Sequence, residues 1–350
     1  MPVSVMVVDD SNLARLVMTL ILGRDQSIEV CAAVSDGEAA LSLIPKCKPD
    51  VITMDLNMPG LSGIEVTRRI MATNPVPIVI VTTDKTSTAN PFQFLEAGAI
   101  AVLCSPAPPG HPEHDQTSEQ LIRTVKALSS VKMFPRRDRG RSPALSTACT
   151  IGSSTLSSVE CIAIGASTGG PQIIKKIIES LPADYPIPIL VTQHIAQGFT
   201  ASFVKWLNAS GKITAVLASD GLKMEPGHVY VAPDDKHLGV TSLSTIALSD
   251  HGRYRMRPSI SHMFHSLASV YGKRCAAILL TGMGKDGAAE MADLKKRGAF
   301  TIAQDKDSSL IHSMPGEAIA CDGASEILAP DKIVERLLAI AATKAKRSPC

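Results

Sequence analysis

The chain has 350 residues, of which 45% are hydrophobic and 19% are charged. This composition is typical of globular proteins, and the length favours two domains. Lys and Arg outnumber Asp and Glu by only 35 to 33 and aromatic residues make up 3%, which argues against a nucleic-acid-binding protein. We see no signal-peptide pattern and no apolar run long enough to span a bilayer. The eight cysteines form no C-x-x-C pair, so we expect free thiols and a cytoplasmic protein without membrane insertion.

Short apolar runs alternate with amphipathic segments along the first third of the chain. The runs cover residues 3–8, 28–34, 50–55, 77–83 and 99–104. Each is about one strand long and rich in β-branched residues, as strands of a covered parallel sheet are. The alternation predicts a doubly wound α/β domain over residues 1–128. Its last helix, expected at 117–128, follows a Pro-rich insertion at 106–116.

Residues 129–156 are rich in Arg, Ser and Pro and show no periodicity, so we expect a linker there. The βα alternation then resumes. Further strands are expected at 159–167, 188–194, 228–233 and 276–282. They predict a second doubly wound parallel α/β domain over residues 157–346.

Three carboxylates stand at predicted strand ends in the first domain. Asp9 and Asp10 end the first strand and Asp55 ends the third. Because carboxyl ends of parallel strands meet at one edge of a sheet, these groups should lie close together. A hard cation such as Mg²⁺ would offset their repulsion, and a carboxylate beside it can attack a phosphoryl group. The alternative is that these aspartates only cap helices or bound turns.

The segments VVDDS (7–11), MDLNMPGLSG (54–63) and VTT (81–83) resemble those of a response-regulator receiver domain, which has a flavodoxin-like fold. This resemblance implies that Asp55 is the phosphoacceptor. It also implies that Asp10 and the backbone of Asn57 help to hold Mg²⁺, with Asp9 behind a water molecule. Thr82 would report the presence of the phosphoryl group.

One position departs from the receiver pattern. The family normally has a Lys-Pro pair at the end of its fifth strand, and this chain has Ser105 before the proline. A serine donates one hydrogen bond but supplies no positive charge. Lys85, just after the fourth strand, is a possible substitute. Coupling of phosphorylation to output is therefore left open.

The second domain opens with GASTG (165–169), which fits the G-x-S-x-G pattern of a serine on a sharp strand-to-helix turn. Ser167 would be the nucleophile, and Pro171 suits the first turn of the following helix. The amide of Thr168 is placed to face a developing oxyanion. A phosphate-binding glycine turn and a purely structural serine are the alternatives.

A base and an orienting acid follow at two other predicted strand ends. His194 closes the strand at 188–194, and Asp286 lies in TGMGKDG (281–287). Alone, the histidine could be structural and the aspartate a helix cap. Together with Ser167, the three required residue types at three strand ends predict a Ser-His-Asp hydrolase. The chain order Ser-His-Asp differs from the Ser-Asp-His order of α/β-hydrolases.

Residues 157–345 resemble the catalytic domain of the chemotaxis protein-glutamate methylesterases. The resemblance is carried by IAIGASTGGP, TQHIAQGFTASFVKWLN, EPGHVYVAPDDKHL, ILLTGMGKDGA, TIAQD and MPGEAI. It implies Ser167 as nucleophile, His194 as general base, Asp286 as orienting carboxylate, and the amides of Thr168 and Met283 as oxyanion donors. Two positions depart from the family: Met256 replaces a usual His before Arg-Pro-Ser, and IHSMP lacks the usual small aromatic or glycine before Met-Pro.

The expected reaction is hydrolysis of glutamate γ-methyl esters on chemoreceptors, with glutamine deamidation as a second activity and no cofactor for the hydrolase. The expected partners are cytoplasmic segments of methylated receptors and a CheA-type histidine kinase. One alternative is the same chemistry on a receptor outside flagellar chemotaxis, with weaker control by phosphorylation. The other is a non-enzymatic adaptor or a DNA-binding response regulator, which the near-neutral charge disfavours.

Overall fold

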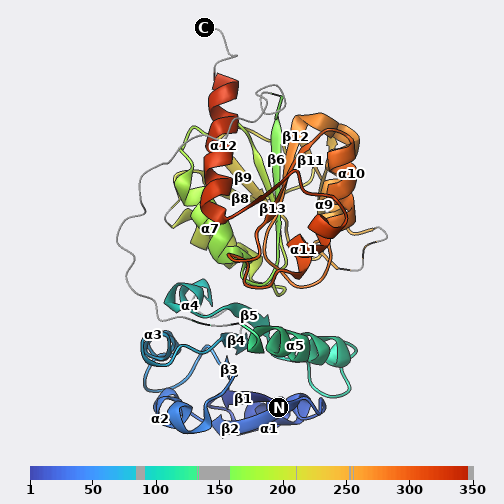
Figure 1. The fold of residues 1–350 in the computed structure, drawn as a ribbon. Coiled ribbons are helices and arrows are strands. Elements are labelled where there is room, and N and C mark those ends of the chain that lie inside the picture. Colours follow the sequence, from blue (N-terminus) through green and yellow to red (C-terminus); the bar gives the residue numbers. More distant parts are fainter. Residues whose placement is uncertain are drawn as a thin grey trace. The chain divides into compact units, whose positions relative to one another are not determined.

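The computed structural model describes residues 1–83, 91–131, 133, 158–209, 211–251, 254 and 256–345. The chain divides into two compact units, Met1–Thr147 and Ala148–Cys350 (Figure 1). The predicted linker at 129–156 lies almost wholly outside the described residues, and so does Lys85. The domain limits of 1–128 and 157–346 therefore stay predictions.

The N-terminal unit is built on five parallel strands in the order β2-β1-β3-β4-β5. The strands are β1 Val3–Val8, β2 Ile28–Val34, β3 Val51–Met54, β4 Ile78–Thr82 and β5 Ala101–Cys104. The helices are α1 Asn12–Leu22, α2 Gly37–Cys47, α3 Gly63–Thr73, α4 Pro91–Ala97 and α5 His114–Ser129. Every predicted strand is present. β3 and β4 at the centre of the sheet are fully buried, as continuous apolar runs predict, whereas β2 and β5 at its edges are largely only partly buried.

Local capping explains where several of these helices begin. The side chains of Ser11, Asp36 and Ser62 each accept a hydrogen bond from the amide three residues further on, at the starts of α1, α2 and α3. One boundary differs from the prediction: α5 begins at His114, inside the segment expected as a Pro-rich insertion. The His114 ring accounts for this, since it is buried with its Nδ1 2.6 Å from the carbonyl oxygen of Ala107.

The C-terminal unit is built on seven parallel strands in the order β14-β13-β12-β6-β7-β9-β8. They are β6 Cys161–Ala166, β7 Ile189–Gln193, β8 Thr214–Leu217, β9 His228–Val231, β12 Cys275–Leu279, β13 Phe300–Gln304 and β14 Glu326–Leu328. The helices are α7 Gly170–Ser180, α8 Thr200–Asn208, α9 Ile260–Val270, α10 Ala288–Lys296, α11 Ser313–Ala320 and α12 Pro330–Ala345, with a short 3₁₀ helix, η1, at Gly272–Arg274. The two doubly wound parallel domains confirm the predicted fold class.

Several C-terminal strands were not predicted, among them β13, which is fully buried between β12 and β14. An antiparallel hairpin of β10 (His237–Ser242) and β11 (Thr245–Ser249) lies outside the main sheet. Strands β8 and β14 at the two edges of the sheet are short and partly exposed. Such segments lack the continuous apolar run by which a buried parallel strand is recognised.

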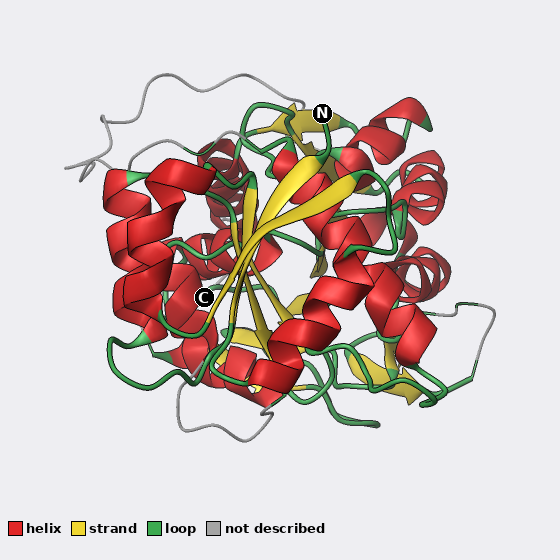
Figure 2. Ribbon diagram, turned by 90° about the horizontal axis from the view of Figure 1, so that it is seen from below, coloured by secondary structure: helices red, strands yellow, loops and turns green. Residues whose placement is uncertain are grey.

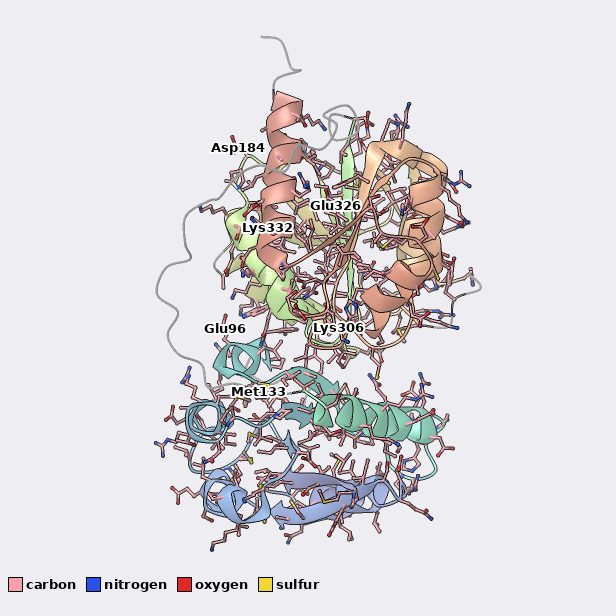
Figure 3. All side chains as sticks on the ribbon, viewed as in Figure 1. Glu96, Met133, Asp184, Lys306, Glu326 and Lys332 are labelled. Atoms are coloured by element: carbon pink, nitrogen blue, oxygen red, sulfur yellow. The ribbon has the colours of Figure 1, made fainter. Side chains whose placement is uncertain are left out.

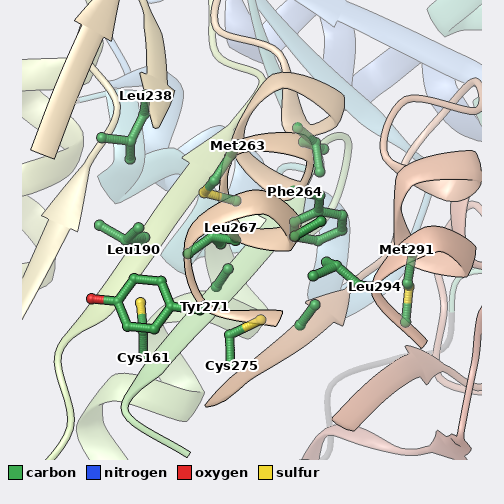
Figure 4. Close-up of a cluster of buried hydrophobic side chains, with 14 of the residues drawn as sticks. Cys161, Leu190, Leu238, Met263, Phe264, Leu267, Tyr271, Cys275, Met291 and Leu294 are labelled. Atoms are coloured by element: carbon green, nitrogen blue, oxygen red, sulfur yellow. The ribbon is translucent and has the colours of Figure 1, made fainter. Parts of the chain in front are cut away.

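Helices cover both faces of the C-terminal sheet, with α7 and α12 on one side and α9, α10 and α11 on the other (Figure 1). Figure 2 shows the helices and strands of both units from below, with strands in the interior and helices around them. Buried side chains of α9 and α10, including Phe264 and Met291, pack with those of β6, β7 and β12 in one apolar cluster (Figure 4). On the other side, Arg336 of α12 holds Glu326 of β14 through two 2.9 Å bonds (Figure 3 labels Glu326).

Candidate active site

Three neighbouring strands of the C-terminal sheet, β12, β6 and β7, end beside one another. Ser167 follows β6, and its amide donates to the carbonyl of Thr281, just after β12, at 3.1 Å. His194 follows β7, and its amide donates to Ala166 at 2.9 Å. The chain leaves β6 toward β7 on one side and later returns to β12 on the other, so Ser167 stands at the topological switch point, where open α/β sheets form their sites.

The turn that presents Ser167 depends on glycines for two different reasons. Gly169 has a φ of +81° at the N-cap of α7, a left-handed conformation that disfavours other residues. Gly282 has no room for a side chain, since a Cβ there would lie 2.6 Å from the Cβ of Ser167. Ser167 is thereby held against the loop that contains Asp286, and it remains partly accessible.

His194 and Asp286 are joined by a 2.9 Å hydrogen bond between Nε2 and Oδ2. The side chains are 11% and 18% exposed, so solvent screens this pair only weakly. With Nε2 engaged by the carboxylate, the ring nitrogen left for the serine hydroxyl is Nδ1. The structure therefore brings the predicted base and acid together on the strands that flank Ser167.

The carboxylate of Asp286 also receives the N-terminus of α9. The amides of Ile260 and Ser261 donate to it at 2.7 and 3.1 Å, and the hydroxyl of Ser259 donates at 3.0 Å. Burial by itself would raise the pKa of Asp286, but the hydrogen bond and charge of His194 and these further donors outweigh burial and lower it. Asp286 therefore stays ionised as the partner of His194.

Ser259 was not predicted as a site residue. Its hydroxyl accepts the amide of His262 as the N-cap of α9 and also donates to Asp286. A serine directly before an apolar helix is a recognisable capping signal. Nothing in the sequence indicates that the first amides of α9 donate to Asp286, which lies in a loop 26 residues after the start of the helix.

The two predicted oxyanion donors are backbone amides beside Ser167. Within the described part of the chain, the amides of Thr168 and Met283 donate to no other protein group. Both residues are partly exposed. They are therefore available to a substrate oxygen, as an oxyanion hole requires.

A pair of histidines lies near the triad. The rings of His237 and His262 stack with centroids 4.7 Å apart, and Tyr254 meets both edge-on. Burial and the neighbouring His237 and His265 lower the pKa of His262 to about 4. Burial and Arg257 lower the pKa of His237 as well, against the charge of Asp286, which raises it. These rings are neutral near pH 7.

Met256, one of the departures from the family pattern, is 54% exposed just before α9.

In the N-terminal unit, Asp9 and Asp10 follow β1 and Asp55 follows the adjacent β3. Burial raises the pKa of Asp55 to about 6, and repulsion by Asp9 and Asp10 adds to that rise, while the amides of Leu56 and Asn57 partly offset it. Burial likewise raises the pKa of Asp9, and Asp10 contributes to that rise. The three carboxylates are thus near enough to repel one another.

This donor set fits a magnesium ion. Among the described residues, no three His, Cys, Asp or Glu side chains form a metal-binding cluster. Mg²⁺ does not require one, because it usually takes one or two carboxylates and keeps several waters. Asp10, Asp55 and the backbone at Asn57 would meet that need with oxygen ligands alone.

Thr82 is buried at the end of β4, and its carbonyl accepts the amide of Ser105 at 2.9 Å. The backbone of Ser105 is therefore next to that of Thr82, the residue of the proposed switch hydroxyl. Lys85, its suggested substitute, lies outside the described residues.

Comparison with known proteins gives a match in both units. The family model described as CheB methylesterase matches residues 162–337, and the one described as response regulator receiver domain matches residues 5–111. Across the described residues, no helix is both long and apolar enough to cross a membrane.

Full-length relatives are similar along nearly the whole chain. A protein-glutamate methylesterase/protein-glutamine glutaminase of Geobacter metallireducens is 41% identical, covering 98% of this chain and 100% of its own length. One from Nitrosospira multiformis is 43% identical, covering 98% of both chains. The crystal structure of the Thermotoga maritima CheB methylesterase catalytic domain is 35% identical, with a TM-score of 0.50 over 51% of this chain and 97% of that chain.

Proposed function

Since this chain belongs to the CheB methylesterase family, we propose that it hydrolyses glutamate γ-methyl esters on chemoreceptors through Ser167, His194 and Asp286. The observation that carries this assignment of residues is the 2.9 Å His194–Asp286 pair, which is formed by the segments that follow the two strands flanking Ser167. Ser, His and Asp at three adjacent strand ends have the roles and relative placement of an acyl-transfer triad.

In the first half of the reaction, Nδ1 of His194 takes the proton of Ser167 as its Oγ attacks the ester carbon. Asp286 stays ionised and stabilises the imidazolium that forms. The amides of Thr168 and Met283 bind the developing oxyanion. The imidazolium then protonates the leaving methoxide, which departs as methanol and leaves an acyl-enzyme.

In the second half, His194 takes a proton from water, and the resulting hydroxide attacks the acyl carbon. Collapse of this intermediate returns the proton to Ser167 and releases the glutamate carboxylate. A primary amide can follow the same path with ammonia as the leaving group. Glutamine deamidation is therefore proposed as a second activity, in line with the double name of the relatives.

The receiver domain is proposed to control this chemistry through phosphorylation of Asp55 by a CheA-type histidine kinase. When bound by Asp10, Asp55 and the backbone at Asn57, Mg²⁺ would neutralise charge on the acidic pocket and the incoming phosphoryl group. Asp55 supplies the attacking oxygen, and Thr82 would donate to the phosphoryl group. The proposed receptor segments are cytoplasmic, and the cytoplasmic location of this chain stays a prediction.

The serine at position 105 favours a second proposal, in which phosphorylation of Asp55 controls the esterase less strongly than it would with a lysine at that position. A cation at its position would pair with the phosphoryl group, whereas its hydroxyl adds only one hydrogen bond. Treatment of the full chain with acetyl phosphate and Mg²⁺ tests this directly. A labelled Asp55 without any change in esterase rate would mean that the switch is uncoupled.

The triad is tested by Ser167→Ala in the full chain, with methanol release from methylated receptor as the measurement. We expect activity to fall by about 10⁴-fold or more, because the nucleophile is lost. Normal methanol release by this variant would refute the proposed role of Ser167. Hydrolysis of a generic ester such as p-nitrophenyl acetate separates loss of chemistry from loss of receptor binding.

A further inference from the structure

Each proposed oxyanion amide belongs to a peptide group whose carbonyl is fixed from the opposite side. The amide of Thr168 shares its peptide plane with the carbonyl of Ser167, and the amide of Met283 shares its plane with the carbonyl of Gly282. Because a trans peptide is planar, its N–H and C=O point in opposite directions. Whatever holds the carbonyl therefore aims the amide.

The carbonyl of Ser167 is held by two donors. The amide of Gly170 donates to it at 2.8 Å, which closes the turn, and Nε2 of Gln193 donates to it at 2.8 Å. The second proton of that Nε2 goes to the carbonyl of His194 at 2.9 Å. One side-chain amide thus ties the nucleophile's turn to the backbone of the base.

Gln193 is 4% exposed at the end of β7, so water has little access to compete for these bonds. Both of its Nε2 partners are carbonyl oxygens, which fixes the orientation of the amide. Its Oε1 is buried and finds no partner among the described residues, and a Cβ at Gly170 would collide with it. Burying an unpaired oxygen costs stability. An apolar side chain would avoid that cost, so stability alone does not explain a glutamine here.

The carbonyl of Gly282 is held in the same way but less firmly. The amide of Met314 donates to it at 3.1 Å, and the hydroxyl of Ser313 donates at 2.9 Å. Ser313 is exposed, so water can replace its hydroxyl. This serine is the residue directly before Met-Pro, where the sequence departs from the family pattern.

On the basis of the function proposed above, we propose that Gln193 is a positioning residue that aims the Thr168 amide at the oxyanion, and that Ser313 is its weaker counterpart for the Met283 amide. Neither side chain touches the reacting atoms. Each acts through the peptide plane whose carbonyl it binds, although Gln193 also binds the carbonyl of His194 and Ser313 also accepts the amide of Gly284 at 3.0 Å. Loss of either should weaken binding of the transition state more than binding of the ester.

The test is Gln193→Met in the full chain, which keeps the length and apolar stem of the side chain but removes both donors. Turnover of p-nitrophenyl acetate and inhibition by an alkyl boronic acid are measured together. The boronic acid forms a bond between boron and Oγ of Ser167, the serine proton passes to His194, and a boron-bound oxygen occupies the oxyanion position. We expect kcat and boronate affinity each to fall about 10- to 100-fold, with KM within about threefold of native.

Ser313→Ala should lower the same two quantities by about threefold to tenfold, because water can take over the lost bond. Gln304→Met is the matched control. Gln304 is a fully buried glutamine at the end of β13, and it binds the amide of Thr281 and the carbonyl of Ser308, but neither oxyanion peptide. Its variant should lose a comparable amount of thermal stability while boronate affinity changes less than about threefold.

The possible outcomes separate this role from the proposed function. Native turnover that does not depend on Ser167 would refute the proposed function itself. Ser167-dependent turnover that is unchanged in Gln193→Met would refute only the positioning role. Equal loss of boronate affinity in Gln193→Met and Gln304→Met would also refute it, because the effect would then be general loosening of the site.

Discussion

Asp286 and Asp55 are both aspartates near the carboxyl ends of parallel strands, yet their electrostatic surroundings are opposite. Asp286 receives His194, a hydroxyl and two amides of a helix N-terminus, which lower its pKa despite burial. Asp55 is half-buried next to two other carboxylates, and its pKa rises to about 6. Similar positions in similar folds therefore give one stabilised anion and one destabilised anion.

The difference shows where each site obtains its positive partners. In the C-terminal site, His194 and the donors at the start of α9 come from the protein itself, so Asp286 is stabilised as an anion without any bound ion or ligand. The N-terminal pocket gathers negative charge that its two amide donors only partly offset, which suits a site completed by a cation and a phosphoryl group from outside. Four experiments test this contrast between the two aspartates.

Asp286→Asn should have the largest effect. The substitution keeps the shape but loses the charge that orients His194 and stabilises its imidazolium, so kcat for ester hydrolysis should fall by about 10⁴-fold. Asp305→Asn is the control, since Asp305 also follows a strand but binds only its own loop. Turnover of Asp286→Asn above one tenth of native would show that the carboxylate has no such role.

Asp55→Asn should stabilise the receiver domain when Mg²⁺ is chelated. An acid with a raised pKa contributes stability below its unfolded value of 3.8, and that contribution is lost as pH rises through about 6. At pH 7 the amide should therefore add about 1–3 kcal/mol to the free energy of unfolding, less any screening by solvent.

Hydrogen exchange in β1 and β3 of the full chain measures this effect on the receiver domain alone. Added Mg²⁺ should stabilise the native chain but not Asp55→Asn, because the ion would lose one of its carboxylate ligands. Equal stabilisation of both proteins would remove Asp55 from the metal site.

Ser259→Ala should have an intermediate effect on turnover. It removes one donor to Asp286 and the N-cap of α9, so we expect kcat to fall about tenfold and stability to fall by about 1 kcal/mol. Ser269→Ala on the same helix is the control, since its hydroxyl bonds only to His265. If Ser259→Ala and Ser269→Ala hydrolyse ester equally fast, Ser259 stabilises only the start of α9 and has no role in catalysis.

The smallest effect concerns acid stability. The pKa of His262 lies at about 4, below its ordinary 6.5, so the unfolded chain binds a proton that the folded chain does not between these values. Stability of the C-terminal unit should fall as pH drops through that window, by less than about 1.4 kcal/mol per pH unit, whereas Asp55 in the N-terminal unit acts in the opposite direction between 3.8 and about 6. Asp286 contributes little there, because the unfolded chain protonates this carboxyl mainly as pH falls to 3.8 and below, which is under the window.

His262→Phe removes this titration, so the pH slope of the unfolding free energy in this range should become smaller. Hydrogen exchange in β6, β7 and β12 of the full chain at several pH values measures the slope for the C-terminal unit alone. An unchanged slope would assign the acid loss to other groups, such as the neighbouring His237.

Site residues that directly follow a strand could be predicted from the sequence, whereas residues that act through contacts across the fold could not. Asp9, Asp10, Asp55, Ser167, His194 and Asp286 each follow a buried apolar strand, and parallel strands bring such ends to one edge. Edge strands β8 and β14, the β10–β11 hairpin and the buried strand β13 were not predicted. β13 has two polar residues, Thr301 and Gln304, among its five, and the two edge strands are short and partly exposed. Ser259 and Gln193 were missed as site residues because their roles depend on contacts across the fold.

Local periodicity and chain order were enough to predict the N-terminal strands, the strands that carry the triad, the fold class and the residues that follow those strands. The tertiary structure decided how each of those residues behaves. A pKa depends on every donor and charge within a few ångströms, and those around Asp286 come from α9 and β7, far away in the chain. The direction of a peptide plane likewise depends on partners such as Gln193, which only folding brings to Ser167.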